Sequence, residues 1–395
     1  MRYMPSNISA SLLLAALLSI FFFISPAISR NEPGELVKTR LEVPEKYKKG
    51  ALRVERTLNV PYGFKVSVFA AGIEGARFMA LDGDGNIYVS LTSGGKVVTL
   101  PDADKDGVAD KAVTFARGLD RPHGLAFKGK DLIVAGAGSL VLLRDENGDL
   151  EADVKRVLTD DVPGGGGHFT RSIVIGPEGD FFISAGSSCN ACVEKDRRRA
   201  AVLRFRDGKA RIYATGLRNS VGIALHTDTK ELWAADNGTD GLGDDIPPEE
   251  LNRIVEGGDY GWPYCYGRKT ADPNFGSPGR CKDTIPAVVE MQAHSAPLGI
   301  AFGFGLEFPH EFRDVLYIAF HGSWNRSVPT GYKLIAIPFR DGKPSGKPFD
   351  VITGWQTETG AWGRPVAPLV GKDGALYLSD DHEGIIYRVT AGEGK

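Results

Sequence analysis

The chain has 395 residues, of which 47 are basic and 50 are acidic, so its formal net charge is -3. This near balance excludes a strongly basic nucleic-acid-binding surface, and we expect a small-molecule partner and no nucleic acid. Fifty glycines and 23 prolines are too many for a helical protein, whereas 42% hydrophobic residues can fill a core. We therefore expect one large all-β domain of short strands joined by tight turns.

The sequence divides into three segments, the first of which has the pattern of a targeting signal. An apolar run from Leu12 to Phe23 precedes the small residues Ala27 and Ser29, so we expect residues 1–29 to be a signal peptide. The protein is then periplasmic or secreted, with no integral membrane span after signal removal; an uncleaved anchor is the alternative. Residues 30–57 are charged and lack periodicity, which predicts an N-terminal arm that is extended on the surface or unstructured.

From residue 58 onwards one theme recurs six times. Each occurrence has a loop with Arg or Pro, an apolar strand, a turn with Gly or Asp, and a second strand rich in Tyr, Val and Ile. The six first strands are expected at residues 77–81, 121–127, 172–175, 218–224, 296–302 and 364–369. The first four are about 50 residues apart, the length of a four-stranded unit, and longer spacings follow. The sequence therefore predicts a six-bladed β-propeller of four-stranded antiparallel blades over residues 58–392.

Small residues in the expected first strands have a packing reason, because the innermost strands of a propeller crowd around its axis. The loops before these strands then converge at one end of the central channel. These loops carry His123, His168, Arg171, Arg218, Asn219 and Arg364. Several arginines at equivalent positions favour an anion bound at the axis. We interpret Arg77, in contrast, as a solvated loop residue.

A run of four glycines, residues 164–167, leads directly into His168 and an apolar strand. An imidazole placed where a flexible loop enters a strand is a candidate general base. The alternative is a histidine that serves only packing. His123 and His294 are expected to line the site without acting in catalysis. The histidines expected at solvated outer turns are His226, His310 and His382.

The four cysteines fit an oxidising compartment. No histidine follows Cys192 directly, which argues against covalent haem attachment at the Cys189–Cys192 segment. We expect two disulfides, Cys189–Cys192 and Cys265–Cys281. The alternative is zinc bound by four thiolates, although the second pair lacks the spacing of a zinc ribbon.

Two loops have the pattern of calcium-binding loops. In the first, Asp102, Asp104, Asp106 and Asp110 place carboxylates at positions 1, 3, 5 and 9. The second loop, residues 145–153, has oxygen-bearing side chains at the same positions. Neither has the glutamate at position 12 that closes an EF-hand loop, and strands are expected on both sides. A β-hairpin without metal is therefore the alternative for each loop.

Three segments, residues 168–177, 216–222 and 243–263, carry a resemblance to a known family. In these segments and over most of residues 58–390, the chain resembles the soluble quinoprotein glucose/sorbosone dehydrogenases. The four cysteines and residues 294–299 look most like the sorbosone dehydrogenase branch. The resemblance implies a six-bladed propeller that oxidises a sugar, or a sugar-derived aldehyde or polyol, with pyrroloquinoline quinone (PQQ) and Ca²⁺. A quinone or cytochrome would accept the electrons.

The resemblance also implies roles for individual residues. His168 matches the catalytic histidine, which removes the hydroxyl proton of the sugar while hydride passes to the quinone. Arg218 and Asn219 match a cofactor-binding pair, and Arg218 would also stabilise the charge of the reduced quinone. Gly238 and Thr239 align with the segment whose backbone carbonyls bind the cofactor's calcium. Further matched or substituting cofactor contacts are Arg364, Arg326 and His321. Independently of the resemblance, the indole of Trp324 is a candidate to stack on a planar cofactor or a sugar, and packing within a blade is the alternative.

Two departures from the family pattern affect the expected chemistry. The family's sugar dehydrogenases have an aspartate where this chain has Ser187, and a hydroxyl cannot stabilise imidazolium by charge. The family's lysine contact to the cofactor has no clean match. Two other functions stay open: a binding propeller without catalysis, and a calcium-dependent lactone hydrolase. Such a hydrolase needs acidic and amide ligands at the axis, where this sequence offers arginines.

Overall fold

The computed structural model describes residues 35–277 and 279–392, and the expected signal peptide lies outside these ranges. The described residues are almost entirely strands and turns. Four short 3₁₀ helices occur among them: η1 (Glu45–Tyr47), η2 (Gly50–Arg53), η3 (Arg280–Asp283) and η4 (His310–Phe312). In the described part of the chain, none of the helices has the length and apolar character needed to cross a bilayer.

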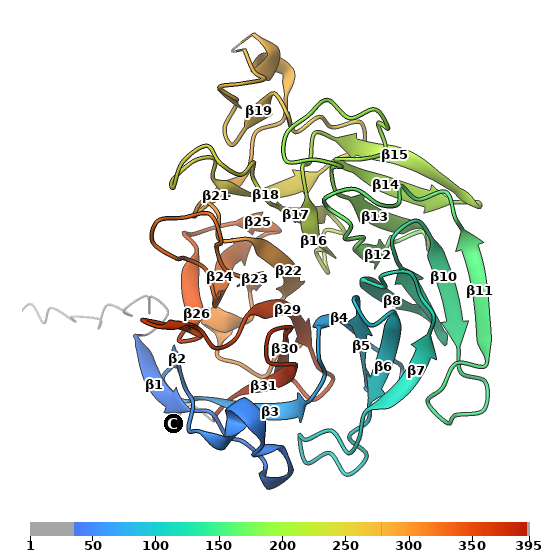
Figure 1. Cartoon of the computed structure of the whole chain (residues 1–395), viewed down its shortest axis with the longest axis vertical. Helices are drawn as coiled ribbons and strands as arrows, with labels where there is room; N and C mark the ends of the chain where they lie inside the picture. The colour runs from blue at the N-terminus through green and yellow to red at the C-terminus, as the bar shows by residue number, and fades with distance from the viewer. Residues whose placement is uncertain (1–34, 278, 393–395) are drawn as a thin grey trace, which may run out of the picture. The chain divides into compact units, whose positions relative to one another are not determined.

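Six antiparallel sheets form the blades (Figure 1). The first three are blade 1 with β4 (Ala76–Leu81), β5 (Ile87–Leu91), β6 (Lys96–Leu100) and β7 (Val113–Arg117); blade 2 with β8 (Gly124–Lys128), β9 (Asp131–Ala135), β10 (Leu140–Arg144) and β11 (Val154–Thr159); and blade 3 with β12 (Ile173–Ile175), β13 (Phe181–Ala185), β14 (Ala201–Arg206) and β15 (Lys209–Thr215). In each of these blades, strands that follow one another in the chain are hydrogen-bonded neighbours.

The other three blades depart slightly from this order. They are blade 4 with β16 (Ser220–Leu225), β17 (Leu232–Asp236), β18 (Glu249–Ile254) and β21 (Val289–Met291); blade 5 with β22 (Pro297–Phe302), β23 (Val315–Phe320), β24 (Lys333–Arg340) and β26 (Phe349–Ile352), plus the short β25 (Lys343–Pro344); and blade 6 with β29 (Pro365–Val370), β30 (Leu376–Asp380), β31 (Ile385–Ala391) and β3 (Phe64–Ala71). Blade 6 thus combines the last three strands of the chain with an early one.

The first strands of the blades form a closed ring around the axis. Contacts run from β4 to β8, β12, β16, β22 and β29, and from β29 back to β4. These are the six strands that the sequence theme places innermost. The prediction of a six-bladed propeller with four-stranded antiparallel blades is therefore confirmed.

Glycines let the inner strands approach one another closely. A Cβ on Gly124 of β8 would lie 2.6 Å from the carbonyl oxygen of Arg171, at the start of β12. A Cβ on Gly299 of β22 would lie 2.5 Å from the Cα of Ala367 in β29, and one on Gly222 of β16 would overlap the carbonyl oxygen of Leu298 in β22. The small residues of these strands are thus required by backbone contact between neighbouring blades.

The hydrophobic core is divided into layers between adjacent blades, and both faces of a blade are buried. In β9, Leu132 and Val134 belong to the cluster shared with blade 1, whereas Ile133 and Ala135 belong to the cluster shared with blade 3. Successive side chains of a strand point to opposite faces. This explains why these strands are continuous apolar runs and do not alternate with polar residues.

Residues 35–57 pack against the outside of blades 5 and 6. Strand β1 (Leu36–Arg40) pairs with β2 (Thr57–Pro61), and Leu41 and Leu52 are buried with the core of these blades. Lys46 Nζ and Tyr47 Oη both donate hydrogen bonds to the carbonyl oxygen of Ala109, at 2.8 and 3.2 Å. The segment is thereby attached to the loop that carries Asp102 to Asp110.

Both expected disulfides, Cys189–Cys192 and Cys265–Cys281, are present. No thiol is left to form a site of four thiolates, so the zinc alternative is excluded for these four residues. The second disulfide closes an insertion in blade 4 that carries the small sheet of β19 (Cys265–Tyr266) and β20 (Thr270–Ala271). A similar two-stranded sheet, β27 (Gln356–Thr357) with β28 (Gly360–Ala361), precedes β29.

Candidate active site at the propeller axis

A cavity of about 520 Å³ opens at the end of the axis where the loops before the inner strands meet. Its apolar base includes Val221 and Leu298, which pack with Phe78 and Val366 of neighbouring inner strands. Its polar residues are Thr92, Ser93, Thr170, Arg77, Arg121, His168, Asn219, His321 and Asp381. The cavity therefore combines an apolar surface with charged and hydrogen-bonding groups from several blades.

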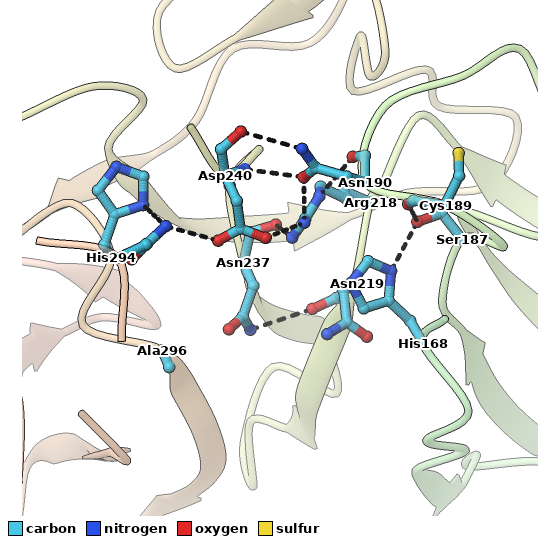
Figure 2. Close-up of polar contacts among 12 residues, drawn as sticks. His168, Ser187, Cys189, Asn190, Arg218, Asn219, Asn237, Asp240, His294 and Ala296 are labelled. Carbon is cyan, nitrogen blue, oxygen red and sulfur yellow. Dashed lines mark hydrogen bonds and ion pairs between the residues drawn. The ribbon is translucent and has the colours of Figure 1, made fainter. Parts of the chain in front are cut away.

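The imidazole of His168 is held in one orientation by Ser187. His168 Nδ1 lies 2.7 Å from Ser187 Oγ, and Ser187 Oγ donates to the carbonyl oxygen of Cys189, also at 2.7 Å (Figure 2). Because the hydroxyl proton points to that carbonyl, Ser187 Oγ accepts a hydrogen bond from the N–H group at His168 Nδ1. Nε2 then carries a lone pair, and none of the described residues hydrogen-bonds to it. This is the tautomer that a general base needs.

His168 is uncharged near neutral pH. Burial lowers the pKa of its imidazole from 6.5 to about 4, and the positive charge of Arg218 acts in the same direction. The neutral ring is half-buried in the cavity lining. It is therefore ready to accept a proton without first losing one.

Two arginines hold the glycine run that precedes His168. The buried side chain of Arg171 donates to the carbonyl oxygens of Thr170 at 2.6 Å, of His168 at 3.0 Å and of Pro163 through Nε at 2.9 Å. Arg199 donates to the carbonyl oxygens of Gly164 and Gly165. Burial lowers the pKa of Arg171 to about 10. Arg171, which the sequence suggested as an anion-binding residue, thus uses its donors on the backbone.

Gly186 provides the space in which His168 and Asn219 approach each other. A Cβ at this position would lie 2.6 Å from the Cβ of His168 and 2.7 Å from Oδ1 of Asn219. Sequence reasoning did not single out Gly186, because the contact depends on a loop of blade 3 meeting a loop of blade 4. The only local signal was a glycine directly after the buried strand β13.

Arg218 is buried, with 3% of its side chain exposed, and most of its donors are occupied. Nε donates to the carbonyl oxygen of Asn190 at 2.8 Å and Nη1 to that of Asn237 at 3.1 Å (Figure 2). Nη2 donates to Asn190 Oδ1 and to the carboxylate of Asp240, both at 2.7 Å. Of its five N–H groups, a single Nη1 hydrogen has no acceptor among the described residues. Arg218 lines a second, narrow cavity beside the axial one.

Asp236, at the end of β17, fixes the backbone of the Arg218–Asn219 pair. Its carboxylate accepts hydrogen bonds from the backbone nitrogens of Arg218 and Asn219, at 3.0 and 2.9 Å, and from Ser220 Oγ at 2.7 Å. Burial raises the pKa of Asp236 to about 6. The side chain of Asn219 is thereby directed to the axial cavity, on the side occupied by His168.

A chain of polar contacts continues from Arg218 to His294. Asp240 accepts a hydrogen bond from Asn325 Nδ2 at 2.8 Å, and that amide nitrogen lies 3.2 Å from His294 Nδ1. His294 Nε2 is 2.8 Å from the carbonyl oxygen of Gly243 and therefore carries the proton. His294 thus connects the insertion of blade 4 to Asp240 and Arg218, but it is not among the residues that line the axial cavity.

The opposite side of the axial cavity contains an ion pair that sequence reasoning missed. Arg77 Nη1 lies 2.7 Å from Asp381 Oδ2, and His321 Nε2 lies 2.8 Å from Asp381 Oδ1. Burial opposes ionisation of Asp381, but the hydrogen bond from His321 and the charge of Arg77 outweigh it, so the pKa of Asp381 lies well below its ordinary value. Burial lowers the pKa of His321 to about 4. The interpretation of Arg77 as a solvated residue was wrong: its side chain is 14% exposed.

The other three residues expected to contact the cofactor, Arg364, Arg326 and Trp324, are not among those that line the axial cavity. Arg364 Nε donates to the carbonyl oxygen of His321 at 3.4 Å, directly behind the cavity lining. Arg326 binds the carbonyl oxygen of Asp244 and the carboxylate of Asp245, and Trp324 is 77% exposed. Arg326 and Trp324 are not brought to the axial cavity in this structure.

Two histidines are not where the sequence predicts them. His226 is buried and packs against Phe302, Phe304 and Phe339, so the expectation that it is solvated was wrong. His123 is fully buried against Phe78 beneath the cavity and does not line it. His310 and His382 are exposed, as expected.

The segment with Gly238 and Thr239 lies above buried carboxylates. Glu249 accepts hydrogen bonds from the backbone nitrogens of Gly238, at 2.8 Å, and Ala296, at 3.0 Å. Burial raises the pKa of Glu249 to about 8. Gly238 and Thr239 line the same narrow cavity as Arg218. The backbone that aligns with a calcium-binding segment is thus fixed from below and adjoins Arg218.

The two acidic loops differ from each other. Carboxylate oxygens of Asp102, Asp104 and Asp106 lie within 4.8 Å of one another. Partial burial and the charges of Asp106 and Asp104 raise the pKa of Asp102. Side chains of both loops accept hydrogen bonds from the backbone of their own loop, but the described carboxylates of the second loop, residues 145–153, form no such cluster, and Asn147 Nδ2 donates to Asp153 at 3.3 Å. The first loop is therefore the better arranged for a cation.

The family model described as TrAA12-like matches residues 58–392, which contain all six blades. The chain belongs to the TrAA12-like family. Sequence reasoning placed the propeller over the same residues.

Individual proteins are similar to this chain along most of its length. An uncharacterized protein of Borreliella burgdorferi is 32% identical over 359 residues, covering 86% of this chain and 92% of the relative. A pyrroloquinoline quinone-dependent pyranose dehydrogenase of Coprinopsis cinerea is 24% identical over 411 residues, and the match covers 86% of this chain but 55% of that protein. The holo form of its PQQ domain has the same fold, with a TM-score of 0.73 at 21% identity, covering 89% of this chain and 98% of the domain.

Proposed function

We propose that this protein is an oxidoreductase that oxidises a sugar, or a sugar-derived aldehyde or polyol, with PQQ as hydride acceptor and Ca²⁺ as a second cofactor. The observation that carries the proposal is His168, a neutral imidazole with a free Nε2 in a cavity that also presents arginines and an apolar base. Alcohol oxidation needs a base beside a hydride acceptor, and the cavity supplies the base.

The axial cavity suits a planar anionic cofactor. Its volume is within the range of small-molecule sites. Val221 and Leu298 offer an apolar surface on which a flat ring system can lie, while Arg77, Arg121 and Asn219 offer donors around it. Arg121 lies over the ring of Phe169, with its guanidinium carbon 5.3 Å from the ring centre. We assign these residues, with Arg364 behind them, to PQQ binding.

When bound, PQQ supplies a carbonyl carbon that accepts hydride. His168 Nε2 takes the hydroxyl proton of the substrate, so the substrate loses two electrons and two hydrogens overall. Ser187 keeps the other ring nitrogen protonated during this step. Asn219 orients polar groups from the His168 side of the cavity, and the free Nη1 hydrogen of Arg218 adds positive potential where negative charge develops.

We assign calcium to two places. The backbone carbonyls of Gly238 and Thr239 would hold the ion associated with the cofactor, and Glu249 beneath them keeps that segment in position. The loop with Asp102, Asp104, Asp106 and Asp110 would hold a second, structural ion. Both assignments use oxygen ligands, which Ca²⁺ prefers.

The proposal is tested by reconstitution. The purified protein is incubated with PQQ and CaCl₂, and reduction of an artificial electron acceptor is followed with a panel of aldoses, sugar aldehydes and polyols. We expect a change in the PQQ spectrum on binding, and turnover with at least one substrate. If PQQ causes neither a spectral change nor thermal stabilisation, the proposal is abandoned. The panel also tests the sorbosone-type substrate that the cysteines and residues 294–299 suggest.

The role of His168 is tested separately. His168→Ala should bind PQQ as tightly as the wild type while turnover falls about 10²- to 10⁴-fold, because only proton transfer is removed. His310→Ala is the control and should keep full activity, because the side chain of His310 is 78% exposed and does not line the cavity. Undiminished turnover of His168→Ala would remove His168 from the mechanism.

A binding propeller without catalysis is the competing function. It requires a ligand at the axis but gives no reason for the protonation state of His168. Binding of PQQ or a sugar without turnover of any substrate in the panel would favour it. A lactone hydrolase is less well supported, since Asp381 is the one carboxylate among the described residues lining the axial cavity, and it is paired with Arg77.

We further propose, from the N-terminal segment and the cysteines, that the protein acts in the periplasm or outside the cell. The natural electron acceptor would then be a quinone or a cytochrome. Fractionation of cells that express the full-length chain, followed by N-terminal sequencing of the mature protein, tests the location and the expected cleavage after residue 29.

A further inference from the structure

The Cys189–Cys192 disulfide closes a four-residue loop at the edge of the site. The loop is closed a second time by Glu194, whose carboxylate accepts hydrogen bonds from the backbone nitrogen and the hydroxyl of Ser188, at 2.5 and 2.8 Å. The peptide groups between the two cysteines are thereby restricted. Two of them make contacts to the residues that the proposed mechanism uses.

One contact of this loop sets the tautomer of His168. The carbonyl oxygen of Cys189 accepts the hydroxyl proton of Ser187. If that carbonyl turned away, the Ser187 hydroxyl could rotate and donate to His168 Nδ1, and the proton of the ring would move to Nε2. Nε2 would then be a donor and could not accept a proton from a substrate. The direction of one carbonyl group in the loop thus decides whether the base is competent.

A second contact of the same loop orients Arg218. Asn190 accepts Arg218 Nε with its backbone carbonyl and Nη2 with its side-chain Oδ1. The same amide exchanges two hydrogen bonds with the backbone of Asp240, accepting from its nitrogen at 2.9 Å and donating to its oxygen at 3.0 Å (Figure 2). Asn190 therefore holds the guanidinium and its carboxylate partner in one arrangement.

We propose that Ser187 and Asn190 are positioning residues, and that the Cys189–Cys192 disulfide keeps them in place, so that His168 and Arg218 are oriented from one covalently closed loop. This inference rests on the proposed function for its catalytic meaning. Its structural content, the tautomer of His168, belongs to the protein without cofactor. The loop fixes the tautomer of His168, as an aspartate at position 187 would, but it does not supply the charge of that aspartate.

The tautomer is measured on the protein without PQQ, by ¹⁵N NMR of selectively labelled histidines at pH 7. The chain has seven histidines, and the His168 signal is assigned by its loss in His168→Ala. We expect a neutral ring with its proton on Nδ1. In Ser187→Ala the proton should move largely to Nε2, the form favoured by a free imidazole. Ser345→Ala, which removes an exposed hydroxyl outside the loop and the cavity, should leave the signal in place. A wild-type ring with its proton on Nε2 overturns the inference.

The two contacts of the loop are separated by a second variant. Asn190→Ala removes the side-chain acceptor for Arg218 and should lower turnover about tenfold while the His168 tautomer stays as in the wild type. Asn190→Asp keeps an acceptor at the same position and should recover part of the activity. If Asn190→Ala shifts the tautomer as Ser187→Ala does, the loop acts through general disorder and the inference fails.

The disulfide itself is tested with Cys189→Ser/Cys192→Ser. We expect a mixture of His168 tautomers and a turnover below that of either single-contact variant, with the far-UV spectrum of the folded propeller retained. An unchanged tautomer and unchanged turnover in the folded variant would show that the disulfide is dispensable for positioning. If PQQ fails to bind even the wild type, the proposed function is lost, but the NMR result still decides how the ring is oriented.

Discussion

The surroundings of His168 determine its protonation state. Burial and the positive charge of Arg218 both disfavour imidazolium, and Ser187 offers a hydrogen bond without a charge. The pKa of about 4 lies below the ordinary 6.5. A group whose charged form is disfavoured stays neutral as the pH falls, so the base should remain active in mildly acidic solution.

This gives a prediction for the pH profile. In the reconstituted enzyme, kcat/KM should be constant from pH 8 to about pH 5 and should fall as the pH drops through about 4, where His168 gains a proton. A base with an ordinary pKa would begin to fail near 6.5 instead. Ser187→Asp should move the acid limb to higher pH, because a carboxylate stabilises imidazolium, whereas Ser187→Ala should not move it upwards. A profile with its midpoint near 6.5 in the wild type would contradict the environment described for His168.

Gly186 gives a second prediction at this scale. Gly186→Ala should fold, but turnover should fall about 10- to 100-fold because the new methyl group displaces His168 and Asn219 from each other. Gly83→Ala is the matched control, since a Cβ at Gly83 meets nothing within 4 Å. Steady-state kinetics and thermal denaturation of both variants separate a local displacement from lost stability. Full activity of Gly186→Ala would show that the loop has room to relax.

Single residues were predictable where the signal is local. His168 follows its glycine run and Asn219 precedes an inner strand, so both could be assigned to the axis from neighbouring sequence. Arg77 could not, because its partner Asp381 lies 304 residues away, across the junction of blades 1 and 6. Asn190 was missed for the same reason: its contacts to Arg218 and Asp240 span two blades.

At the scale of elements, the acidic loop of residues 102–110 is the candidate cation site that we favour, because three of its carboxylates lie close together. Its three clustered carboxylates repel one another without a cation. Lys46 and Tyr47 hold its far end through the carbonyl oxygen of Ala109. The loop is thus held at Ala109 and carries clustered negative charge at Asp102, Asp104 and Asp106. A bound cation would neutralise these carboxylates and stabilise the loop next to residues 46 and 47.

We predict that calcium binding at this loop can be counted. Isothermal titration calorimetry of the protein without PQQ should show one Ca²⁺ fewer for Asp104→Asn/Asp106→Asn than for the wild type. The matched control is Asp149→Asn, in the loop of similar sequence, where the described carboxylates form no such cluster. An equal number of ions in the wild type and the double variant would leave the first loop as a hairpin without metal.

The inner strands were predictable to within a few residues, and the reason is physical. Each inner strand is short, apolar and preceded by Arg or Pro, and each is followed by a tight turn, so the six copies reinforce one another. The insertions were harder. The small sheets β19–β20 and β27–β28 and the helix η3 lie in segments without a repeat, and their positions depend on a disulfide and on packing against distant strands.

In the whole molecule, contact between blades is made by backbone as much as by side chains. Gly222 tests this. Gly222→Ala should destabilise the protein by about 1–3 kcal/mol, because the added methyl group meets the carbonyl oxygen of Leu298 in a strand of the next blade, and neither backbone can move without opening the ring. Urea denaturation, compared with Gly83→Ala, measures the loss. A change below 1 kcal/mol would mean that the ring tolerates expansion.

The number and order of the blades could be predicted from the repeat, since a fixed period implies stacked copies of one unit. The closure of the ring could not. Strand β3 precedes the first complete repeat and has no motif that marks its partner, yet it pairs with β31 over residues 64–71. Only the requirement that every blade has four strands points to that pairing, and it leaves open which end of the chain supplies the missing strand.

The pairing of β3 with β31 sets the order in which parts of the propeller can fold. As the chain emerges from the ribosome, blades 1 to 5 can form in turn, but β3 can pair with β31 only after Ile385 to Ala391 have been made. Arg77 is made early and Asp381 late, so the two sides of the axial cavity meet only after the last strand is in place. A nascent chain that has not yet reached Asp381 therefore lacks one side of the axial cavity.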